Sequence, residues 1–497
     1  MIEIFLKKQE FSKLEIFKYI TFENAITTQD LMTEFNLPRS TTKRYIADIN
    51  SLLSQHKNTE SYQVLQNEEH KYYVTNIDKA DKIYFFHKFQ ELFLQESLTF
   101  RVFSTVFIAD NINFFDLATE LNISSGYLYK ILALLNKQLK PYSIHFEKNE
   151  QTISIDGSEK NIRVFYTYIL YSVHQNLSWP FTKNQETEVK LDILSWKDSK
   201  IKKKSLSKRT RLNFFLAIMG KRIKDDCIVH SLPRYVGETI DVFMKFNDAK
   251  ALVNTRSQIL TQNKMTTAEY QLMNLILRMY DGEFDTKVEM KRIGEALNQI
   301  DSPIVKFSKD LRKAFFSELP VEKNKKNEDY FLYYAVLHNT YLFCFADSLD
   351  AVYETQYSYN MEKTYANSNF RNPIRTLYKK TLENNSVKTP ENLVEVGTRF
   401  LFTLFNLYKI TTLKIFVQHA SNSLGEPLIK SELLKLFSSD SIEFVTNTQL
   451  ADVIISDCVE EINDTSTYFL LIDLFNLKAW RDLADFIKDR LFELSFS

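Results

Sequence analysis

The spacing of apolar residues near the start of the chain predicts two helices joined by a tight turn. Leu31 and Phe35 lie one helical turn apart, and Asn36-Leu37-Pro38 interrupts the helix. Apolar residues then recur at three- and four-residue steps along one face: Tyr45, Ile46, Ile49, Leu52 and Leu53. A short helix, a turn and an amphipathic second helix form a helix-turn-helix unit.

The same pattern returns 86 residues later. Leu117 to Ile123 matches Leu31 to Leu37 in register, and Asn136 matches Asn50 at the same offset. Ser124 is a favourable N-cap for the second helix of this copy. The inner stripe of that helix is Leu128, Ile131, Leu132 and Leu135. We therefore predict two helix-turn-helix units in tandem.

Each unit is followed by a β-hairpin pattern. Residues 62–65 and 71–74 are β-type segments on either side of the polar residues 67–70. Residues 144–146 and 152–155 repeat the arrangement around residues 148–150. The prediction is a winged helix-turn-helix domain over residues 1–80 and a second one over residues 81–158.

A helix-turn-helix places its second helix in the major groove of DNA, so the polar face of that helix carries the candidate contacts. In the first unit these residues are Arg39, Ser40, Thr41, Lys43 and Arg44, with Lys71 from the wing. In the second unit they are Ser125, Tyr127 and Lys130. Paired winged helices also serve as protein-docking modules, and that alternative stays open.

Charge neither supports nor excludes a nucleic-acid partner. The chain has 63 basic and 63 acidic residues, so there is no broad basic field. Binding to double-stranded DNA would depend on the local cations of the two helices and on formation of a homodimer or a higher oligomer, which multiplies the phosphate contacts.

Composition predicts a mainly α protein that acts in the cytoplasm. Only 8 Gly and 9 Pro occur in 497 residues, which favours long helices. Cys227, Cys344 and Cys458 have no paired spacing, so we expect neither disulfides nor a metal site. Charges near the N-terminus argue against a signal peptide, and the most apolar run, residues 330–345, is too short for a membrane span. We expect no membrane association.

The middle of the chain has helical periodicity from residue 159 to about residue 405, which predicts two helical bundles over residues 159–283 and 284–408. The charged segment 322–328 is expected to be a loop. Residues 409–497 differ, because strand-type segments (413–417, 442–445, 452–455 and 468–472) alternate with helical ones (427–437 and 479–494). This alternation predicts a parallel α/β domain.

The order of these domains resembles that of the Mga-type transcription regulators of Gram-positive bacteria, which include the AtxA-like virulence regulators. The resemblance rests on the paired helix-turn-helix units, on the entry Gly157-Ser158-Glu159 into two helical domains, and on the final α/β domain. It implies that the helical domains are phosphotransferase-system (PTS) regulatory domains, in which sugar-uptake carriers phosphorylate histidines. It also implies that the last domain is EIIB-like.

The resemblance directs attention to three candidate phosphorylation sites. His174 lies in the first helical domain, and His338 loosely matches a family helix that ends in a phosphorylatable histidine. His419 occupies the place of the EIIB cysteine, whereas Asn213 stands where related domains have histidine. For His174 and His338 a hydrogen-bonded interior histidine is the alternative, and His230 is expected in an exposed loop.

These observations predict a DNA-binding transcription regulator that is not an enzyme and uses no cofactor. PTS phosphocarrier proteins would be further partners. The alternative is an EIIB-like phosphotransfer protein that uses His419, although the cysteine of that chemistry is missing. RNA antitermination is a third possibility, but helix-turn-helix units are unsuited to reading RNA. No motif for nucleotide binding or for acyl transfer is apparent.

Overall fold

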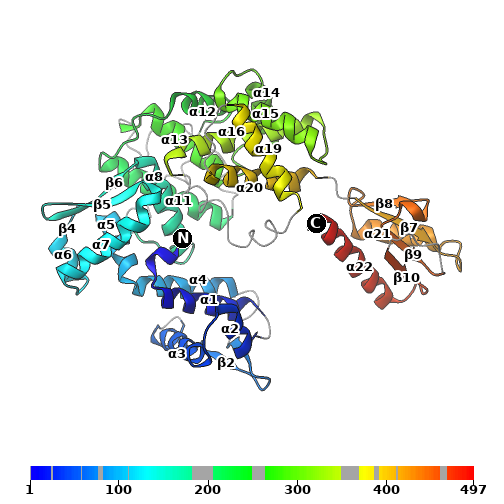
Figure 1. Ribbon diagram of the computed structural model, residues 1–497, viewed down its shortest axis with the longest axis horizontal. Coiled ribbons are helices and arrows are strands. Elements are labelled where there is room, and N and C mark those ends of the chain that lie inside the picture. The colour runs from blue at the N-terminus through cyan, green and yellow to red at the C-terminus, as the bar shows by residue number, and fades with distance from the viewer. Residues whose placement is uncertain are drawn as a thin grey trace. The chain divides into compact units, whose positions relative to one another are not determined.

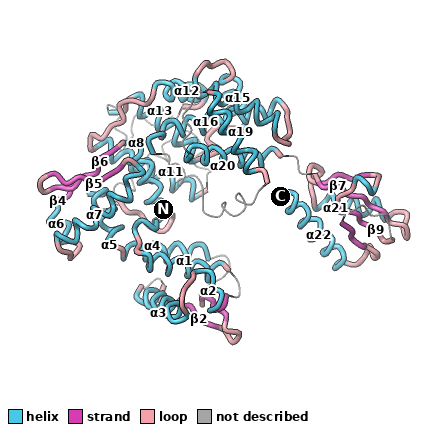
Figure 2. Tube along the Cα trace, in the orientation of Figure 1, coloured by secondary structure: helices cyan, strands magenta, loops and turns pink. Residues whose placement is uncertain are grey.

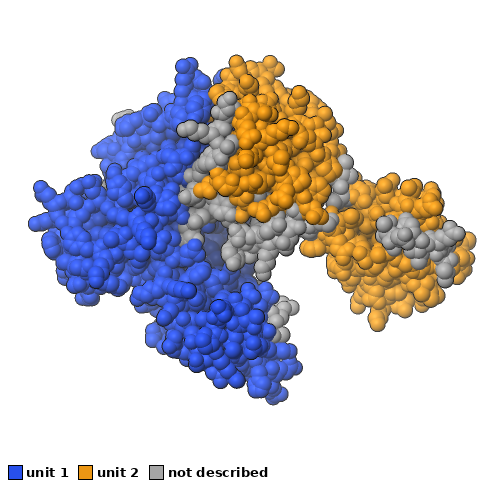
Figure 3. All heavy atoms as spheres, in the orientation of Figure 1, with its two compact units in different colours: residues 1–293, 337–357 blue, residues 294–336, 358–497 orange. Residues whose placement is uncertain are grey.

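The computed structural model describes residues 2–23, 26–56, 59–75, 82–109, 111–181, 205–248, 264–348, 369–385, 391–409, 412–458 and 467–496. This described part is mainly helical with small sheets, as predicted (Figures 1 and 2). It divides into two compact units, residues 1–293 with 337–357 and residues 294–336 with 358–497 (Figure 3). The division into five domains stays a prediction.

The first helix-turn-helix region, called the first head below, comprises residues 8–74. A 3₁₀ helix, η1 (Ile2–Phe5), precedes it. Its elements are α1 (Lys8–Phe22), β1 (Ile26–Thr27), α2 (Thr28–Phe35), α3 (Arg39–Gln55), β2 (Val64–Gln66) and β3 (Lys71–Val74). The sheet order is β1-β3-β2, and both pairings are antiparallel. The predicted helices and hairpin are present.

The second head comprises residues 98–157 and repeats this element order. Its elements are α5 (Leu98–Ala109), β4 (Ile112–Asn113), α6 (Phe114–Glu120), α7 (Ser125–Leu139), η2 (Lys140–Tyr142), β5 (Ile144–Asn149) and β6 (Thr152–Gly157). The sheet order β4-β6-β5 matches that of the first head, again with antiparallel pairs. The repeat is therefore one of backbone structure as well as of sequence.

The repeat extends further toward the N-terminus than the sequence pattern indicated. Apolar residues of α1 and α5 that stand 86 positions apart are buried in both heads: Leu14 and Phe100, Ile16 and Val102, Phe17 and Phe103, Ile20 and Val106. The short strands β1 and β4 were not predicted, because two residues are too few to display a period of two. Each of them completes a three-stranded sheet.

Helix α4 (Lys82–Glu96) lies between the two heads in sequence and contributes to the core of the first. The ring of Phe89 packs against that of Phe17 with centroids 3.9 Å apart, and Phe85 lies in the same cluster. Among the described residues no single helix has the length and apolar composition of a membrane span, while α4 and α5 together pass that test across an 85° bend.

The middle of the chain is helical, as its periodicity predicted. The helices are α8 (Glu159–His174), α11 (Leu206–Lys224), α12 (Arg234–Phe246), α13 (Thr267–Tyr280), α14 (Lys287–Leu297), α15 (Pro303–Glu318), α16 (Lys325–Cys344), η5 (Ala346–Ser348), α19 (Arg371–Asn384) and α20 (Glu391–Tyr408). The apolar run 330–345 falls in α16 and its end.

The charged segment 322–328 is only partly a loop, which corrects the prediction. Helix α16 begins at Lys325. The Asn324 side chain accepts a hydrogen bond from the backbone N–H of Asn327 at 2.8 Å, as an N-terminal cap does. The high density of charged residues had led to the prediction of a loop where helix α16 begins.

The C-terminal residues form the predicted parallel sheet. Its elements are β7 (Leu413–Gln418), α21 (Gly425–Leu436), β8 (Ile442–Val445), η6 (Thr448–Leu450), β9 (Val453–Ser456), β10 (Thr467–Leu470) and α22 (Leu477–Phe496). The strand order is β10-β9-β7-β8, and every pairing is parallel. Helices and sheet share one apolar core that includes Ile415, Ile429, Ile455 and Leu483.

Candidate nucleic-acid interface

The turn between the two helices has the same backbone geometry in both heads. Asn36 and Asn122 adopt left-handed conformations, with φ of 49° and 54°. Asparagine tolerates this region better than most residues. The next residue closes the turn in each copy, because Leu37 N–H donates to Met32 O at 3.1 Å and Ile123 N–H donates to Ala118 O at 2.9 Å.

The repeated asparagine of the second helix fixes that helix to its wing. Asn50 donates from Nδ2 to Val64 O at 3.0 Å and accepts at Oδ1 from Val64 N–H at 2.7 Å. Asn136 makes the same pair of bonds with Phe146, at 2.9 and 2.7 Å. One amide thus holds the first wing strand against the recognition helix in each head. This contact of Asn50 or Asn136 is called the asparagine clamp.

The candidate residues of α3 lie on its outer face. Arg39, Ser40, Lys43 and Arg44 are exposed, and Thr41 is half-buried. The opposite face is buried through Tyr45, Ile46 and Ile49. In the described part of the chain no carboxylate forms an ion pair with the three cations of this face, although the Arg44 guanidinium lies 5.6 Å from the Tyr45 ring centroid. Their charge is available to an anionic ligand.

The wing lysine differs from those cations. Lys71 Nζ lies 2.6 Å from Glu69 Oε2 within the hairpin. This hydrogen bond and the lysine charge lower the pKa of Glu69. Exposed pairs of this kind are weak, so a phosphate could replace the carboxylate. Lys71 stays a predicted contact whose charge is already balanced in this conformation.

On α7 of the second head, Tyr127 and Lys130 are exposed and Ser125 is half-buried. Gly126 and Tyr129 are also exposed on α7, although neither was among the predicted contacts. Tyr129, which is 50% exposed, stands 86 positions after Lys43. A position-by-position comparison of the two copies would have identified it.

A lysine of the second wing was also missed. Lys148 Nζ in β5 lies 5.3 Å from the centroid of the Phe114 ring and 5.7 Å from that of Tyr129. The two rings pack together with centroids 4.5 Å apart. A cation over aromatic faces is held in place electrostatically. The outer surface of the second head therefore combines the exposed rings of Tyr127 and Tyr129 with Lys148, which lies near Tyr129 and the buried Phe114.

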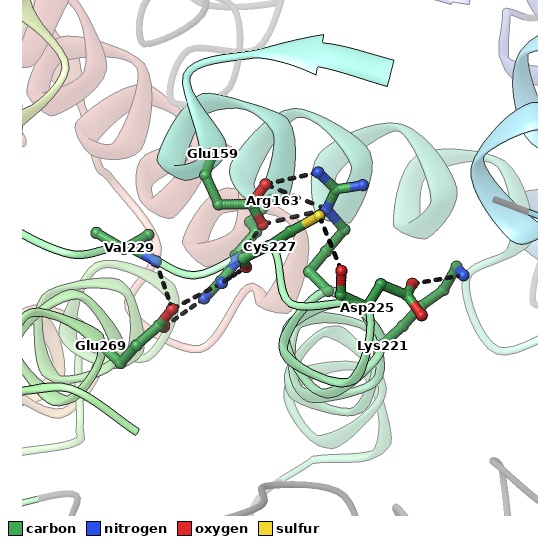
Figure 4. Close-up of polar contacts among 8 residues, drawn as sticks. Glu159, Arg163, Lys221, Asp225, Cys227, Val229 and Glu269 are labelled. Carbon is green, nitrogen blue, oxygen red and sulfur yellow. Dashed lines mark hydrogen bonds and ion pairs between the residues drawn. The ribbon is translucent and has the colours of Figure 1, made fainter. Parts of the chain in front are cut away.

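Helix α8 connects the second head to the helical region through a buried ion-pair network (Figure 4). The Arg163 side chain is 0% exposed and makes a two-pronged interaction with Glu269, in which Nη2 donates to Oε1 at 2.8 Å. It also donates to Glu159 Oε1 and to the backbone carbonyl of Cys227, both at 2.8 Å. Glu269 accepts in addition from Val229 N–H at 2.8 Å.

The same helix packs on α5 through aromatic side chains, Phe165 against Phe103 at 6.0 Å between ring centroids and Tyr166 at shorter distances. Tyr166 is fully buried and stacks on Phe103 and Phe107, with ring centroids 4.4 and 3.7 Å away. Arg222 of α11 adds a hydrogen bond to Glu159 Oε2 at 2.7 Å. The second head is thus continuous with a helix that is fixed on both of its sides.

The contact between α4 and α8 is polar and buried. Glu91, 0% exposed, lies beside His174, whose Nδ1 is 3.4 Å from Glu91 Oε1 and 2.7 Å from Ser178 Oγ. Lys88 Nζ lies 2.7 Å from Glu91 Oε2. Burial alone would raise the pKa of Glu91, but hydrogen bonds from His174, Lys88 and Ser178 outweigh it and lower the pKa to about 2.

The three candidate phosphorylation sites are all buried in this conformation. His174, His338 and His419 are 6%, 4% and 6% exposed. Burial lowers the pKa of His338 to about 3, so that side chain is neutral near pH 7. His230, in contrast, is exposed in the segment between α11 and α12.

The loop after β7 holds an internal carboxylate. Asp457, whose side chain is 1% exposed, accepts hydrogen bonds from Ala420 N–H at 2.7 Å and Ser421 N–H at 2.8 Å. The Ser421 side chain is the largest of the effects that hold the pKa of Asp457 well below its usual range. His419 Nδ1 lies 3.3 Å from Asp457 Oδ2. Backbone amides that could bind a phosphoryl group therefore already bind Asp457.

Two comparisons with known proteins agree with the features of the second head. Residues 85–170, which contain all of its elements and most of α8, match the Mga helix-turn-helix domain. A protein of Streptococcus pneumoniae serotype 4 described as a "Putative trans-acting regulator" is 28% identical over 108 residues. That match covers 22% of this chain and 21% of the relative. The resemblance to Mga-type regulators is confirmed, and both matches support a DNA-binding transcription regulator.

Proposed function

We propose that the chain is a DNA-binding transcription regulator of the Mga type that contacts duplex DNA with both heads. The observation that carries the proposal is the repeated helix-turn-helix, in which turn, clamp and wing recur while the outer face of α3 presents unpaired cations in the described structure. Helix-turn-helix units place this face in the major groove.

The charge balance bears on how tightly one copy would bind. With equal numbers of acidic and basic residues, attraction to DNA depends on the few cations of the recognition faces. A homodimer or a higher oligomer would double or multiply these contacts. We therefore propose that the regulator acts as an oligomer, and that a lone copy binds weakly.

In vitro selection from random duplexes with the full chain would supply a binding sequence, and a gel shift on that duplex tests the assignment. Replacing Lys43 and Arg44 by Ala should abolish the shift while thermal unfolding stays unchanged, because both side chains are exposed. A matched control replaces the exposed pair Lys379 and Lys380 of α19. Equal affinity of the two variants would refute the assignment.

PTS-dependent phosphorylation of a histidine is a further part of the proposal. Phosphorylation adds nearly two negative charges and would open the buried surroundings of His174 or His338. Accessibility favours His230 as the residue that a carrier reaches first. Incubation with PTS phosphocarrier proteins, followed by mapping of the labelled residue, tests this. Absence of incorporated phosphate would refute the proposal of histidine phosphorylation and would leave the proposal of DNA binding untouched.

The alternative is EIIB-like phosphotransfer through His419. The parallel sheet and the loop after β7 support an EIIB-like domain, but Asp457 occupies the loop amides and His419 is buried. A second anion beside this carboxylate is unfavourable. Phosphate found on His419 after incubation with a phosphorylated sugar carrier would revive this alternative.

A further inference from the structure

The two heads present different chemistry at equivalent positions, and this difference carries an inference that rests on the proposed function. We propose that the heads divide the work of recognition. Helix α3 supplies charge for the phosphate backbone, and helix α7 reads base edges in the major groove with Tyr127 and Tyr129 beside Gly126. The three lines of argument are charge, aromatic exposure and the missing side chain at position 126.

The first line is the loss of charge on α7. Arg39 of the first head corresponds to Ser125 of the second, and Lys43 corresponds to Tyr129. Only the pair Arg44 and Lys130 keeps a cation at both positions. Phosphate contacts require cations, hydrogen-bond donors or a helix N-terminus, so α7 has fewer means of binding the backbone. Its outer face is suited to another part of the duplex.

The second line is the exposure of two tyrosines. Tyr127 and Tyr129 are 40% and 50% exposed. A tyrosine ring can contact the C5-methyl group of thymine, and its hydroxyl both donates and accepts hydrogen bonds, as base edges in the major groove require. Tyr129 packs against Phe114, with Lys148 near both rings. Its orientation is therefore set before a ligand arrives, which lowers the entropy lost on binding.

The third line is Gly126 in the first turn of α7. A Cβ atom added there would meet no heavy atom within 4 Å, so the fold itself has room for alanine. Glycine is a poorer helix former than alanine. At this exposed position the absence of a side chain lets the backbone approach a ligand closely, which is one of the common roles of glycine in binding sites. Ser40 is the corresponding residue of α3.

Tyrosine, serine and glycine are also frequent in the antigen-binding loops of antibodies, so a protein partner for α7 is the competing outcome. The position of these residues favours DNA, because they lie on the outer face of the recognition helix of a helix-turn-helix. The experiment must therefore separate base reading from phosphate binding and from protein binding.

The experiment measures the affinity of the full chain for a selected duplex and for an unrelated duplex over a series of salt concentrations. Two quantities result. The first is the slope with which log affinity falls as log salt rises, taken as a positive number, and the second is the ratio of specific to non-specific affinity. Lys43→Ala should lower the slope by about 0.9 and leave the ratio unchanged. Tyr127→Ala should leave the slope unchanged and lower the ratio roughly tenfold. Lys380→Ala is the control for both.

Gly126→Ala provides a test that does not depend on loss of stability. Because the added methyl group meets open space, thermal unfolding should stay the same or rise, while the affinity ratio falls. An unchanged affinity ratio in both Gly126→Ala and Tyr127→Ala would overturn the inference. It would also be overturned if the slope of Tyr127→Ala fell as much as that of Lys43→Ala. An unchanged ratio is also the result expected if α7 docks a protein partner and does not read bases. A wild-type chain that binds neither duplex would instead refute the proposed function.

Discussion

The two heads share one backbone plan and differ in the surface that the plan presents. Both have a left-handed asparagine in the turn and an asparagine clamp from helix to wing. The outer face of α3 carries three cations, whereas that of α7 carries two tyrosines and one lysine. Positions that determine the fold are therefore equivalent in the two copies, and positions free to contact a ligand have diverged.

The heads also differ in how they join helix α8. The second head runs directly into α8, and the buried Arg163 then fixes that helix to α13. The first head reaches α8 through α4, where Glu91 meets His174. The second head is thus joined to α8 through the chain itself and the Arg163 ion pair. The first head contacts α8 through the polar group around Glu91, whose protonation should weaken the contact. The following changes test these differences, from the largest expected effect to the smallest.

Breaking the network of the second head should have the largest effect. Arg163→Met leaves Glu269 buried without its partner, and removal of one member of a buried pair costs about 3–5 kcal/mol. Chemical denaturation would measure the free energy of unfolding. The control Arg234→Met removes a 90% exposed arginine paired with Glu238 and should have little effect. Similar values for the two variants would show that Arg163 does not fix α8.

Acid should weaken the connection of the first head. The folded-state pKa of Glu91 is about 2, below the ordinary glutamate value of 4.5. The stabilisation is therefore present above pH 4.5 and is lost as the pH falls toward 2, for a total of about 3 kcal/mol. Denaturation measured at pH 5 and at pH 2.5 should show most of this loss. The variant Glu91→Gln should be less stable than the wild type at pH 5, and its free energy of unfolding should fall less between pH 5 and pH 2.5. A variant with the same pH dependence as the wild type would contradict the role given to Glu91.

The asparagine clamps should contribute equally in the two heads. Asn50→Ala and Asn136→Ala each leave a backbone N–H and a C=O of the wing without a partner, at a cost of about 1–3 kcal/mol. Thermal unfolding of the two variants would be compared with that of Gln138→Ala, which removes a half-buried side chain of α7 outside the clamp. Clamp variants that differ widely would show that the two heads are not equivalent in their folding.

Giving the second head a cation of the first should have the smallest effect. Tyr129→Lys restores the residue type of Lys43 and should raise the slope of log affinity against log salt by about 0.9. Non-specific affinity should increase while discrimination falls. Binding in a salt series measures both. An unchanged slope would show that a lysine at this position does not reach a phosphate. An unchanged ratio of specific to non-specific affinity would contradict the base contact proposed for Tyr129.

The sequence was sufficient to predict the helix-turn-helix units, because an apolar stripe at helical spacing and a turn residue are local signals. The mainly α class and the parallel C-terminal sheet followed from the same periodicity. Strands β1 and β4 were missed because a two-residue strand has no period, and the start of α16 was missed because its cap is a single side chain.

Contacts between distant parts of the chain could not be predicted. Nothing near Asp457 indicates that its carboxylate binds the amides of Ala420 and Ser421, which lie more than thirty residues earlier. The burial of His338 and His419 likewise depends on tertiary packing. Asn136 was recognised as a match of Asn50, but its role required the position of the wing strand. Pairing across the fold thus sets the chemistry of each candidate site.

Photo-crosslinking tests the central claim, that both recognition helices contact duplex DNA, most directly. A photoreactive phenylalanine analogue would replace Ser40 on α3 and, in a second variant, Tyr127 on α7, with Lys380 of α19 as the control position. We expect both helix positions to crosslink to a selected duplex and the control to remain unlinked. Failure of either position to crosslink under conditions where the duplex is bound would contradict the claim.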